Sequence, residues 1–194
     1  MKKLILAIAL CLVCAVSFGQ NNNHFTFKGV DMGKNKSEFV RELISKGYKY
    51  HTLNGSIEHE GYLLDGEFAG YDCGMIGVYC SGNDVWKIVL WLDPRTDWYS
   101  LKSQYNTLKD AYITKYGEPS GDFHFFKSPY DEGDGYEALA VKSDKCRYYT
   151  IWELSNGSIS LEITNDMEVK IVYEDAQNTK KRFDEQKNKR ISDI

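Results

Sequence analysis

The sequence VWKIVLWL (residues 85–92) is the most clearly patterned stretch of the chain, and the turn DPRT (93–96) follows it. Its β-branched and aromatic residues, its short length and the turn residues at both borders predict a β-strand. On such a strand the side chains alternate between two faces, which carry Trp86, Ile88, Leu90 and Leu92 on one side and Val85, Lys87, Val89 and Trp91 on the other. Since Lys87 alone is polar, we expect an interior strand with both faces at least partly covered.

A long amphipathic helix is predicted directly after this turn. Asp97 is a good N-cap. The apolar residues behind it recur every three or four positions, at Trp98, Leu101, Tyr105, Leu108, Tyr112 and Tyr116. Gly117 ends the helix, and Pro119 prevents its continuation. Because an apolar stripe of this length must be buried, the helix is expected to pack on the preceding strand.

A shorter helix and further strands are predicted around this unit. Asn35 and Glu38 resemble a capping box in front of a helix of about three turns, and Gly47 ends it. A short strand is conceivable at 24–30 and again near 48–53. Clearer strands are predicted at 61–70, 73–80, 85–92, 122–126, 137–142, 147–154, 158–164 and 168–174.

The turn Gly82-Asn83 sets the pairing of strand 85–92 with the strand before it. A two-residue loop there places Tyr79 opposite Trp86, Gly77 opposite Ile88 and Gly74 opposite Trp91. Large side chains over glycines indicate that the Trp91 ring lies across the backbone of the neighbouring strand.

A three-stranded meander is predicted near the end of the chain. The turn Asn156-Gly157 sets Leu154 against Ile159, Trp152 against Leu161 and Thr150 against Ile163. After Thr164, an odd-numbered loop sets Ile163 against Val169, whereas a two-residue loop would bury Glu168. The meander therefore has one core face and one face in contact with water.

Together these elements predict an α+β fold with an antiparallel sheet and two helices on one of its faces. The order of elements suggests an approximate duplication of a helix-plus-three-strand unit, at about 35–92 and 97–174. We expect a single domain at 20–175 and a charged, solvated helix or tail at 176–194.

The first 19 residues read as a secretory signal peptide. Lys2 and Lys3 precede an apolar run, and Ser17 and Gly19 offer the small residues that a signal peptidase reads. The chain is therefore expected to be exported, to the periplasm or beyond the cell, and to have no membrane span after cleavage. The remainder has 22 basic and 28 acidic residues, a formal charge of −6 that argues against nucleic acid as a partner.

Three cysteines follow the leader. Cys73 and Cys80 are seven residues apart, so on a continuous strand they point to opposite faces and are too far apart to form a disulfide. A bridge, if one forms, joins Cys146 to one of the other two. Three buried reduced thiols are the alternative.

Several short motifs resemble a family of small exported bacterial proteins. They are GEFAGYDC (66–73), Trp98 with Leu101, Tyr105 with Leu108 and Lys109, KYGEP (115–119), and Tyr173 with Asp175 and Asn178. The resemblance covers most of the chain behind the leader and implies no activity and no catalytic residues. The order of helix and meander is also similar to that of β-lactamase inhibitor proteins and of small outer-membrane assembly lipoproteins, a likeness of architecture alone.

Motifs for chemistry are incomplete. His51 and His59 with Glu58 and Glu60 lack zinc-site spacing, and the acidic loop at 131–135 lacks the EF-hand pattern. No Gly-x-Ser-x-Gly motif occurs, and no cysteine has a histidine partner at a recognisable spacing. We therefore expect no cofactor, no metal and no catalytic residue.

The best binding candidate is the water-facing side of the meander, formed by Arg147, Tyr149, Ile151, Glu153 and Glu162. Flat aromatic and apolar groups inside a polar rim are typical of protein interfaces. The sequence thus predicts a non-catalytic module that binds another protein through its sheet. A binder of carbohydrate or another small ligand through exposed aromatic rings is the alternative, and an unrecognised hydrolase is the third reading.

Overall fold

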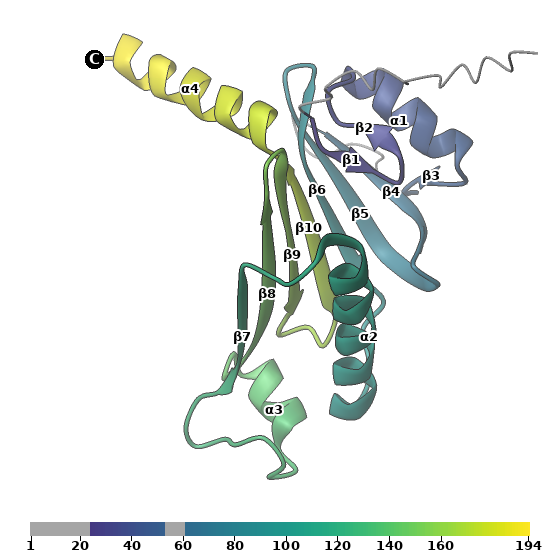
Figure 1. Ribbon diagram of the computed structural model, residues 1–194, viewed down its shortest axis with the longest axis vertical. Coiled ribbons are helices and arrows are strands. Elements are labelled where there is room, and N and C mark those ends of the chain that lie inside the picture. Colours follow the sequence, from purple (N-terminus) through teal and green to yellow (C-terminus); the bar gives the residue numbers. More distant parts are fainter. Residues whose placement is uncertain (1–23, 53–60) are drawn as a thin grey trace, which may run out of the picture.

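A large antiparallel sheet with helices on it forms the body of the protein (Figure 1). The structure, a computed structural model, describes residues 24–52 and 61–194. Its helices are α1 (Lys36–Ser45), α2 (Trp98–Tyr116), α3 (Glu137–Lys142) and α4 (Ala176–Ser192). Its strands are β1 (Thr26–Phe27), β2 (Val30–Asp31), β3 (Lys49–Tyr50), β4 (Gly61–Phe68), β5 (Tyr71–Ser81), β6 (Asp84–Leu92), β7 (Gly121–Phe126), β8 (Cys146–Leu154), β9 (Gly157–Ile163) and β10 (Val169–Asp175). The predicted α+β class is confirmed. The leader at 1–19 and His59 with its two glutamates lie outside the described residues.

The strands β3 to β10 form one eight-stranded sheet in the order β3-β4-β5-β6-β10-β9-β8-β7, and β1 and β2 form a separate hairpin. The predicted interior strand β6 lies between β5 and β10. The helix-and-strand runs before and after residue 95 therefore meet side by side at the β6–β10 pair. That arrangement is compatible with one half being a duplicate of the other, which stays a prediction.

Both predicted helices begin at the expected caps. The side chain of Asn35 accepts a 3.0 Å hydrogen bond from the backbone N–H of Glu38, and that of Asp97 accepts one of 2.9 Å from Ser100. Their apolar stripes enter one continuous core over the sheet face that carries Ile88 and Ile171. In Figure 1 both helices lie on the same side of the sheet.

Hydrogen bonds inside this core also attach α2 to the sheet. The hydroxyl groups of Tyr112 and Tyr173 are hydrogen-bonded at 2.6 Å, and those of Tyr105 and Thr150 at 2.5 Å. The indole N–H of Trp152 donates to the carbonyl of Gly117, where α2 ends. These bonds satisfy polar groups that would otherwise be buried without partners.

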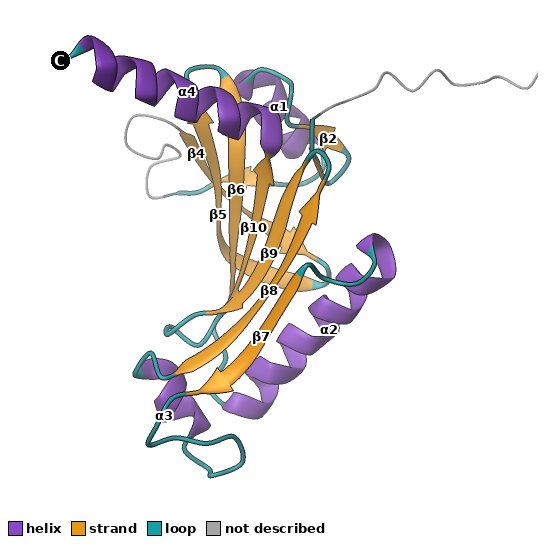
Figure 2. Ribbon diagram, turned by 60° about the vertical axis from the view of Figure 1, so that its left-hand side comes forward, coloured by secondary structure: helices purple, strands orange, loops and turns teal. Residues whose placement is uncertain are grey.

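The helix α4 leaves the end of β10 and projects from the body (Figures 1 and 2). Its N-cap is Asp175, which is fully buried and accepts a hydrogen bond from the N–H of Asn178. The side-chain amide of Asn178 donates to the carbonyls of Met32 and Val85. These bonds hold the first turn of α4 against the N-terminal half of the chain, while the later turns are mostly exposed.

One predicted strand is a helix. EALAVK (137–142) forms α3, whose Ala140 and Val141 are buried. The prediction was wrong because a six-residue apolar run is short enough for either element, and Ala, Leu, Glu and Lys all favour a helix.

Two irregularities in the β5–β6 pairing correct the predicted faces. The turn pairs Ser81 with Asp84 as expected, but Cys80 faces Val85 and Tyr79 faces Lys87, so Trp86 is an extra residue. A bulge of this kind turns a side chain to the other face. Trp86 therefore lies on the side of Lys87 and Trp91, away from Ile88, and Val85 is buried.

The same irregularities change the pairing of the glycines and the orientation of the cysteines. Gly77 faces Val89, and the residue opposite Trp91 is Met75. The Trp91 ring does lie across the neighbouring strand, because a Cβ built on Gly77 would be 3.2 Å from it. Cys73 and Cys80 are both buried in the core instead of pointing to opposite faces.

The meander has the expected faces with one shift in register. Ile163 pairs with Val169 and Leu161 with Ile171, as predicted. In the β8–β9 hairpin Leu154 pairs with Gly157 and Trp152 with Ile159, two residues from the predicted pairs. Since a shift by two preserves the face, the predicted core side remains correct.

Candidate functional site

The side of the sheet opposite α1 and α2 is the candidate site, and we call it the outer face. Alternation along the paired strands assigns its members: Met75, Gly77 and Tyr79 of β5; Lys87, Val89 and Trp91 of β6; Lys170, Val172 and Glu174 of β10; Ser158, Ser160 and Glu162 of β9; Arg147, Tyr149, Ile151 and Glu153 of β8; and Gly121, Phe123 and Phe125 of β7. Among the described elements, no helix crosses this face between α4 and α3 (Figure 2).

An ion-pair patch occupies the β8–β9–β10 part of the outer face. Glu162 accepts a 2.8 Å hydrogen bond from Arg147 on one strand and makes a 2.6 Å ion pair with Lys170 on the other. The guanidinium of Arg147 also lies 4.6 Å from the ring centre of Tyr149. A planar cation stacked on an aromatic ring and bonded to a carboxylate has few conformations left. The patch is therefore a preorganised surface.

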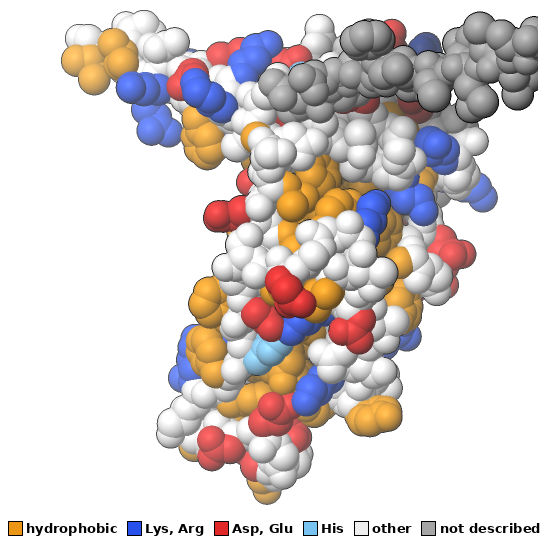
Figure 3. All heavy atoms as spheres, in the orientation of Figure 1, with side chains coloured by type: hydrophobic (Ala, Val, Ile, Leu, Met, Phe, Trp, Pro, Cys, Tyr) orange, Lys and Arg blue, Asp and Glu red, His pale blue; other side chains and the backbone are white. Residues whose placement is uncertain are grey.

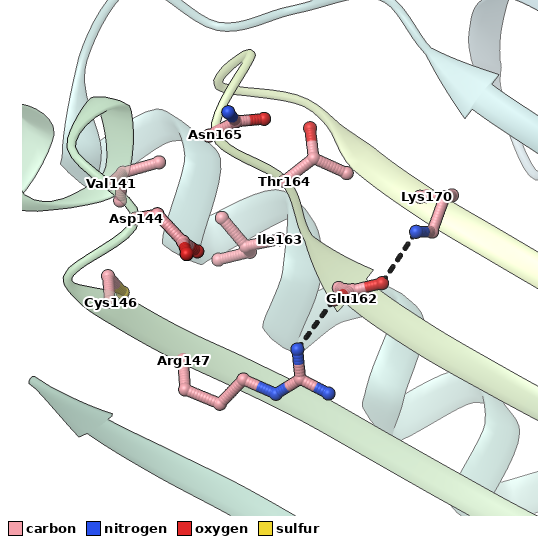
Figure 4. A pocket seen from close by; sticks show the side chains of 9 residues that line it. All are labelled: Val141, Asp144, Cys146, Arg147, Glu162, Ile163, Thr164, Asn165 and Lys170. Carbon is pink, nitrogen blue, oxygen red and sulfur yellow. Dashed lines mark hydrogen bonds and ion pairs between the residues drawn. The ribbon is translucent and has the colours of Figure 1, made fainter.

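A cavity of about 310 Å³ opens beside this patch, at the end of β8 and the β9–β10 turn (Figure 4). Figure 4 shows Glu162 between Arg147 and Lys170, with Asp144, Cys146 and Asn165 on the far rim. Burial, with a smaller contribution from Glu132, raises the pKa of the Cys146 thiol to about 12. At neutral pH this sulfur is therefore a thiol, which is a poor nucleophile.

A second part of the outer face is a groove of about 380 Å³ on β5, β6 and β10, which we call the tryptophan groove. Its lining residues are Tyr79, Trp86, Lys87, Val89, Trp91, Lys170, Val172 and Arg182. The guanidinium of Arg182, on α4, lies 4.2 Å from the ring centre of Trp86. The ammonium of Lys87 is 5.4 Å from the same ring and forms a 3.0 Å ion pair with Glu174.

The structure brings together part of the predicted site. Arg147, Tyr149 and Glu162 are in contact, and Ile151 follows on the same strand. Glu153 is six residues from Arg147 along β8, about 20 Å away, and lines a different cavity with Ser158 and Glu174. It is not part of the ion-pair patch.

The tryptophan groove was missed by the sequence analysis. Strict alternation, which does not anticipate a bulge, predicts that Trp86 shares a face with Ile88, and Arg182 reaches the groove from a helix expected to be solvated. The pair Gly82-Asn83 next to two tryptophans is a weak signal that the strand there is irregular.

Titratable groups also gather on the inner side of β7 and β8. His124 is 3.0 Å from Asp122, which accepts hydrogen bonds from Thr150 at 2.7 Å and from Lys109. Burial opposes the ionisation of Asp122, but the bonds from Lys109 and Thr150 outweigh it and hold its pKa below the usual range. Burial also lowers the pKa of His124, against the attraction of Asp122. At neutral pH the carboxylate is thus charged and the imidazole neutral.

The polar groups of this inner cluster form hydrogen bonds with one another. The Thr150 hydroxyl donates to Asp122, away from His124, and also contacts the Tyr105 hydroxyl. The nucleophile–base hydrogen bond of a triad is therefore not formed by this threonine and this histidine. Within the described residues, no three His, Cys, Asp or Glu side chains are grouped as metal ligands.

In the part of the chain that the structure describes, no helix has both the length and the apolar character needed to cross a membrane. Comparisons with known proteins found no matching family model, and neither the curated proteins nor the solved structures gave a match.

Proposed function

We propose that this chain is a non-catalytic, exported module that binds another protein through the outer face of its sheet. One observation carries the proposal: Tyr149, Ile151, Val172 and Trp91 lie half-buried on a sheet face that no described helix covers. Aromatic and apolar groups among paired charges are the composition of protein interfaces. Export is supported by the leader at 1–19.

The shape of the face favours a protein over a small ligand. Small-molecule sites enclose most of the surface of their ligand. Here the two cavities of about 310 and 380 Å³ are open hollows on one sheet face, and Lys170 borders both. A partner that covers both hollows at once would extend across β6, β10, β9 and β8 on this face.

The half-buried Trp86 and Trp91 also favour a second candidate, a carbohydrate ligand. A sugar ring would need a free aromatic face. Arg182 and Lys87 both lie over Trp86, and the Trp91 ring packs against Gly77. Since both rings are already in contact with groups of the protein itself, the protein partner is the stronger candidate.

The chemistry of the described groups supports a non-catalytic role. The Cys146 thiol is protonated at neutral pH, because its pKa is about 12. On β7 and β8, the Thr150 hydroxyl donates to the carboxylate partner of His124. Neither group is poised for nucleophilic attack.

The test is affinity capture from the native envelope fraction with three forms of the protein. Replacing Tyr149 and Ile151 by Ala removes the apolar centre of the face and leaves the core unchanged, so we expect native circular dichroism and loss of the captured partner. The control is Tyr99→Ala, which truncates an equally large tyrosine, 84% exposed, on α2.

Equal recovery of one partner by all three forms would contradict the proposal. So would failure of the wild-type protein to enrich any protein over an empty matrix. A glycan array probed with the wild type, Trp91→Ala and Tyr99→Ala tests the carbohydrate alternative, for which binding must be lost in Trp91→Ala and retained in Tyr99→Ala.

A further inference from the structure

The strand β7 is the edge of the eight-stranded sheet. It pairs with β8 on one side, and among the described residues no strand pairs with its other side. Its four central residues, Asp122, Phe123, His124 and Phe125, are all exposed. Phe123 and Phe125 are 50% and 48% exposed. Figure 3 shows hydrophobic side chains at the margin where β7 lies in Figure 1.

This edge lacks the protections that proteins place on free strands. Lysine, proline and bulges at an edge discourage pairing with another chain. GDFHFF (121–126) contains neither lysine nor proline, and its six pairs with β8 are in unbroken register. Its one inward-facing charge is Asp122, which forms an ion pair with Lys109 of the same chain. Six regular residues with two exposed phenylalanines form a site for strand addition.

We propose that β7 pairs antiparallel with β7 of a second copy of this chain, so that the two sheets become one. The backbone geometry permits such a pairing. Lys127 donates a 2.7 Å hydrogen bond to Lys145 across the β7–β8 pair. Since hydrogen-bonded pairs alternate, Phe123 and Phe125 direct their backbone groups to β8, and Asp122, His124 and Phe126 direct theirs outward.

The sequence of β7 complements itself in one register. Side chains stay on their own faces only when residues of the same face oppose each other. With Phe123 opposite Phe123 of the second copy, Asp122 lies opposite His124 and Gly121 opposite Phe125. A carboxylate then faces an imidazole at both hydrogen-bonded pairs, and opposite-charge or polar cross-strand pairs are favourable.

The aromatic side of this register is also complementary. The ring of Phe123 lies over Gly121 of its own strand, because a Cβ built there would be 2.9 Å from the ring. Phe125 of the second copy would arrive beside that ring. The alternative register, with His124 opposite His124, sets Asp122 against Phe126 and so places a carboxylate beside a phenyl ring.

Space for the second copy exists on both sides of the sheet. The helix α2 packs mainly over β9 and β10 and reaches β7 with the side chains of Lys109 and Tyr105, so β8 and β7 of each copy would lie between the two helices, at about 4.8 Å per strand. On the side of the sheet opposite α2, the outer faces of the two copies would form one continuous surface. The inference stands apart from the proposed function, because self-association is measured without the partner.

The first test is sedimentation velocity of the purified protein from about 10 to about 500 µM. The wild type is expected to dimerise, and Phe123→Lys is expected to raise the dissociation constant at least tenfold, because the two lysines would face each other at the axis. The control, Tyr99→Lys, changes an exposed ring on α2 and should dimerise as the wild type does. Monomers throughout, or a dimer that Phe123→Lys leaves unchanged, would overturn the proposal.

The second test reads the register by cysteine cross-linking. The two Phe123 residues form a non-hydrogen-bonded pair in the proposed register, with Cα atoms about 4.5 Å apart, which a disulfide can span. Under mild oxidation Phe123→Cys should therefore give a linked dimer, and Tyr99→Cys should not. Preferential linkage through His124→Cys, or no linkage above the Tyr99→Cys control, would overturn the register.

Discussion

The carboxylate of Asp175 accepts a 2.6 Å hydrogen bond from the backbone N–H of Phe25, 150 residues away in the chain. The same carboxylate accepts from His24 Nδ1 at 3.1 Å and from the N–H of Asn178 at 2.8 Å. It is fully buried, at the point where β10 becomes α4. One side chain thus joins the start of the described chain to its last strand and last helix, and it supports the end of the outer face where Arg182 reaches Trp86.

Asp175→Ala is expected to lower the free energy of unfolding by about 3 kcal/mol, because two buried backbone N–H groups lose their acceptor. Urea denaturation followed by circular dichroism measures this. Asp184→Ala removes an exposed carboxylate of α4 that pairs with Lys180, and should leave the midpoint unchanged. Equal stability of Asp175→Ala and the wild type would show that the hydrogen bonds of Asp175 do not stabilise the fold.

Tyr112→Phe and Tyr173→Phe are each expected to lower the free energy of unfolding by about 1 kcal/mol, because each leaves the other buried hydroxyl without its partner. The double variant removes both hydroxyls, so its loss should be smaller than the sum of the two single losses. A double-mutant cycle in urea gives the coupling. Strict additivity would contradict the 2.6 Å hydrogen bond.

Stability is expected to fall as the pH rises above about 9. Burial raises the pKa of Cys73 and of Cys146 to about 12, and that of Tyr48 to about 12, from ordinary values of 9.0 and 10.0. Between these values the unfolded chain releases protons that the folded chain retains. The unfolded state then binds fewer protons, so the free energy of unfolding decreases with rising pH.

Urea midpoints measured from pH 7 to pH 11 test this, with the sharpest decline expected above pH 9. Alkylation provides a second measurement: the thiols of Cys73 and Cys146 should react slowly with iodoacetamide at pH 8 until urea unfolds the chain. Rapid alkylation of the folded protein, or a midpoint independent of pH, would contradict the burial of these groups.

The parts of this fold that follow a local rule are predictable from the sequence. Asn35 and Asp97 cap their helices because their side chains reach an N–H three residues on, a relation that needs no tertiary contact. The Ile163–Val169 pairing follows from the need to keep Glu168 out of the core. Arg147, Tyr149 and Glu162 are neighbours because alternation along paired strands determines which side chains share a face.

The other features of the fold depend on contacts between residues that are far apart in the sequence. The bulge at Trp86 allows Val85 and Ile88 both to be buried, although strict alternation along the strand would place them on opposite faces. Arg182 joins the outer face through the orientation of α4, which Asp175 and Asn178 set by bonds to Phe25, Met32 and Val85. EALAVK (137–142) carries no periodicity that separates a helix from a strand, and its packing beside β8 decides.

Hydroxyl-radical footprinting of the protein with its captured partner tests the outer face most directly. It compares side-chain oxidation in the free and bound states, residue by residue. The account predicts that Tyr149, Ile151 and Trp91 become protected in the complex, and that Tyr99 on α2 is oxidised equally in both states. Protection of Tyr99 or of α1 with no change at Tyr149 and Ile151 would contradict it.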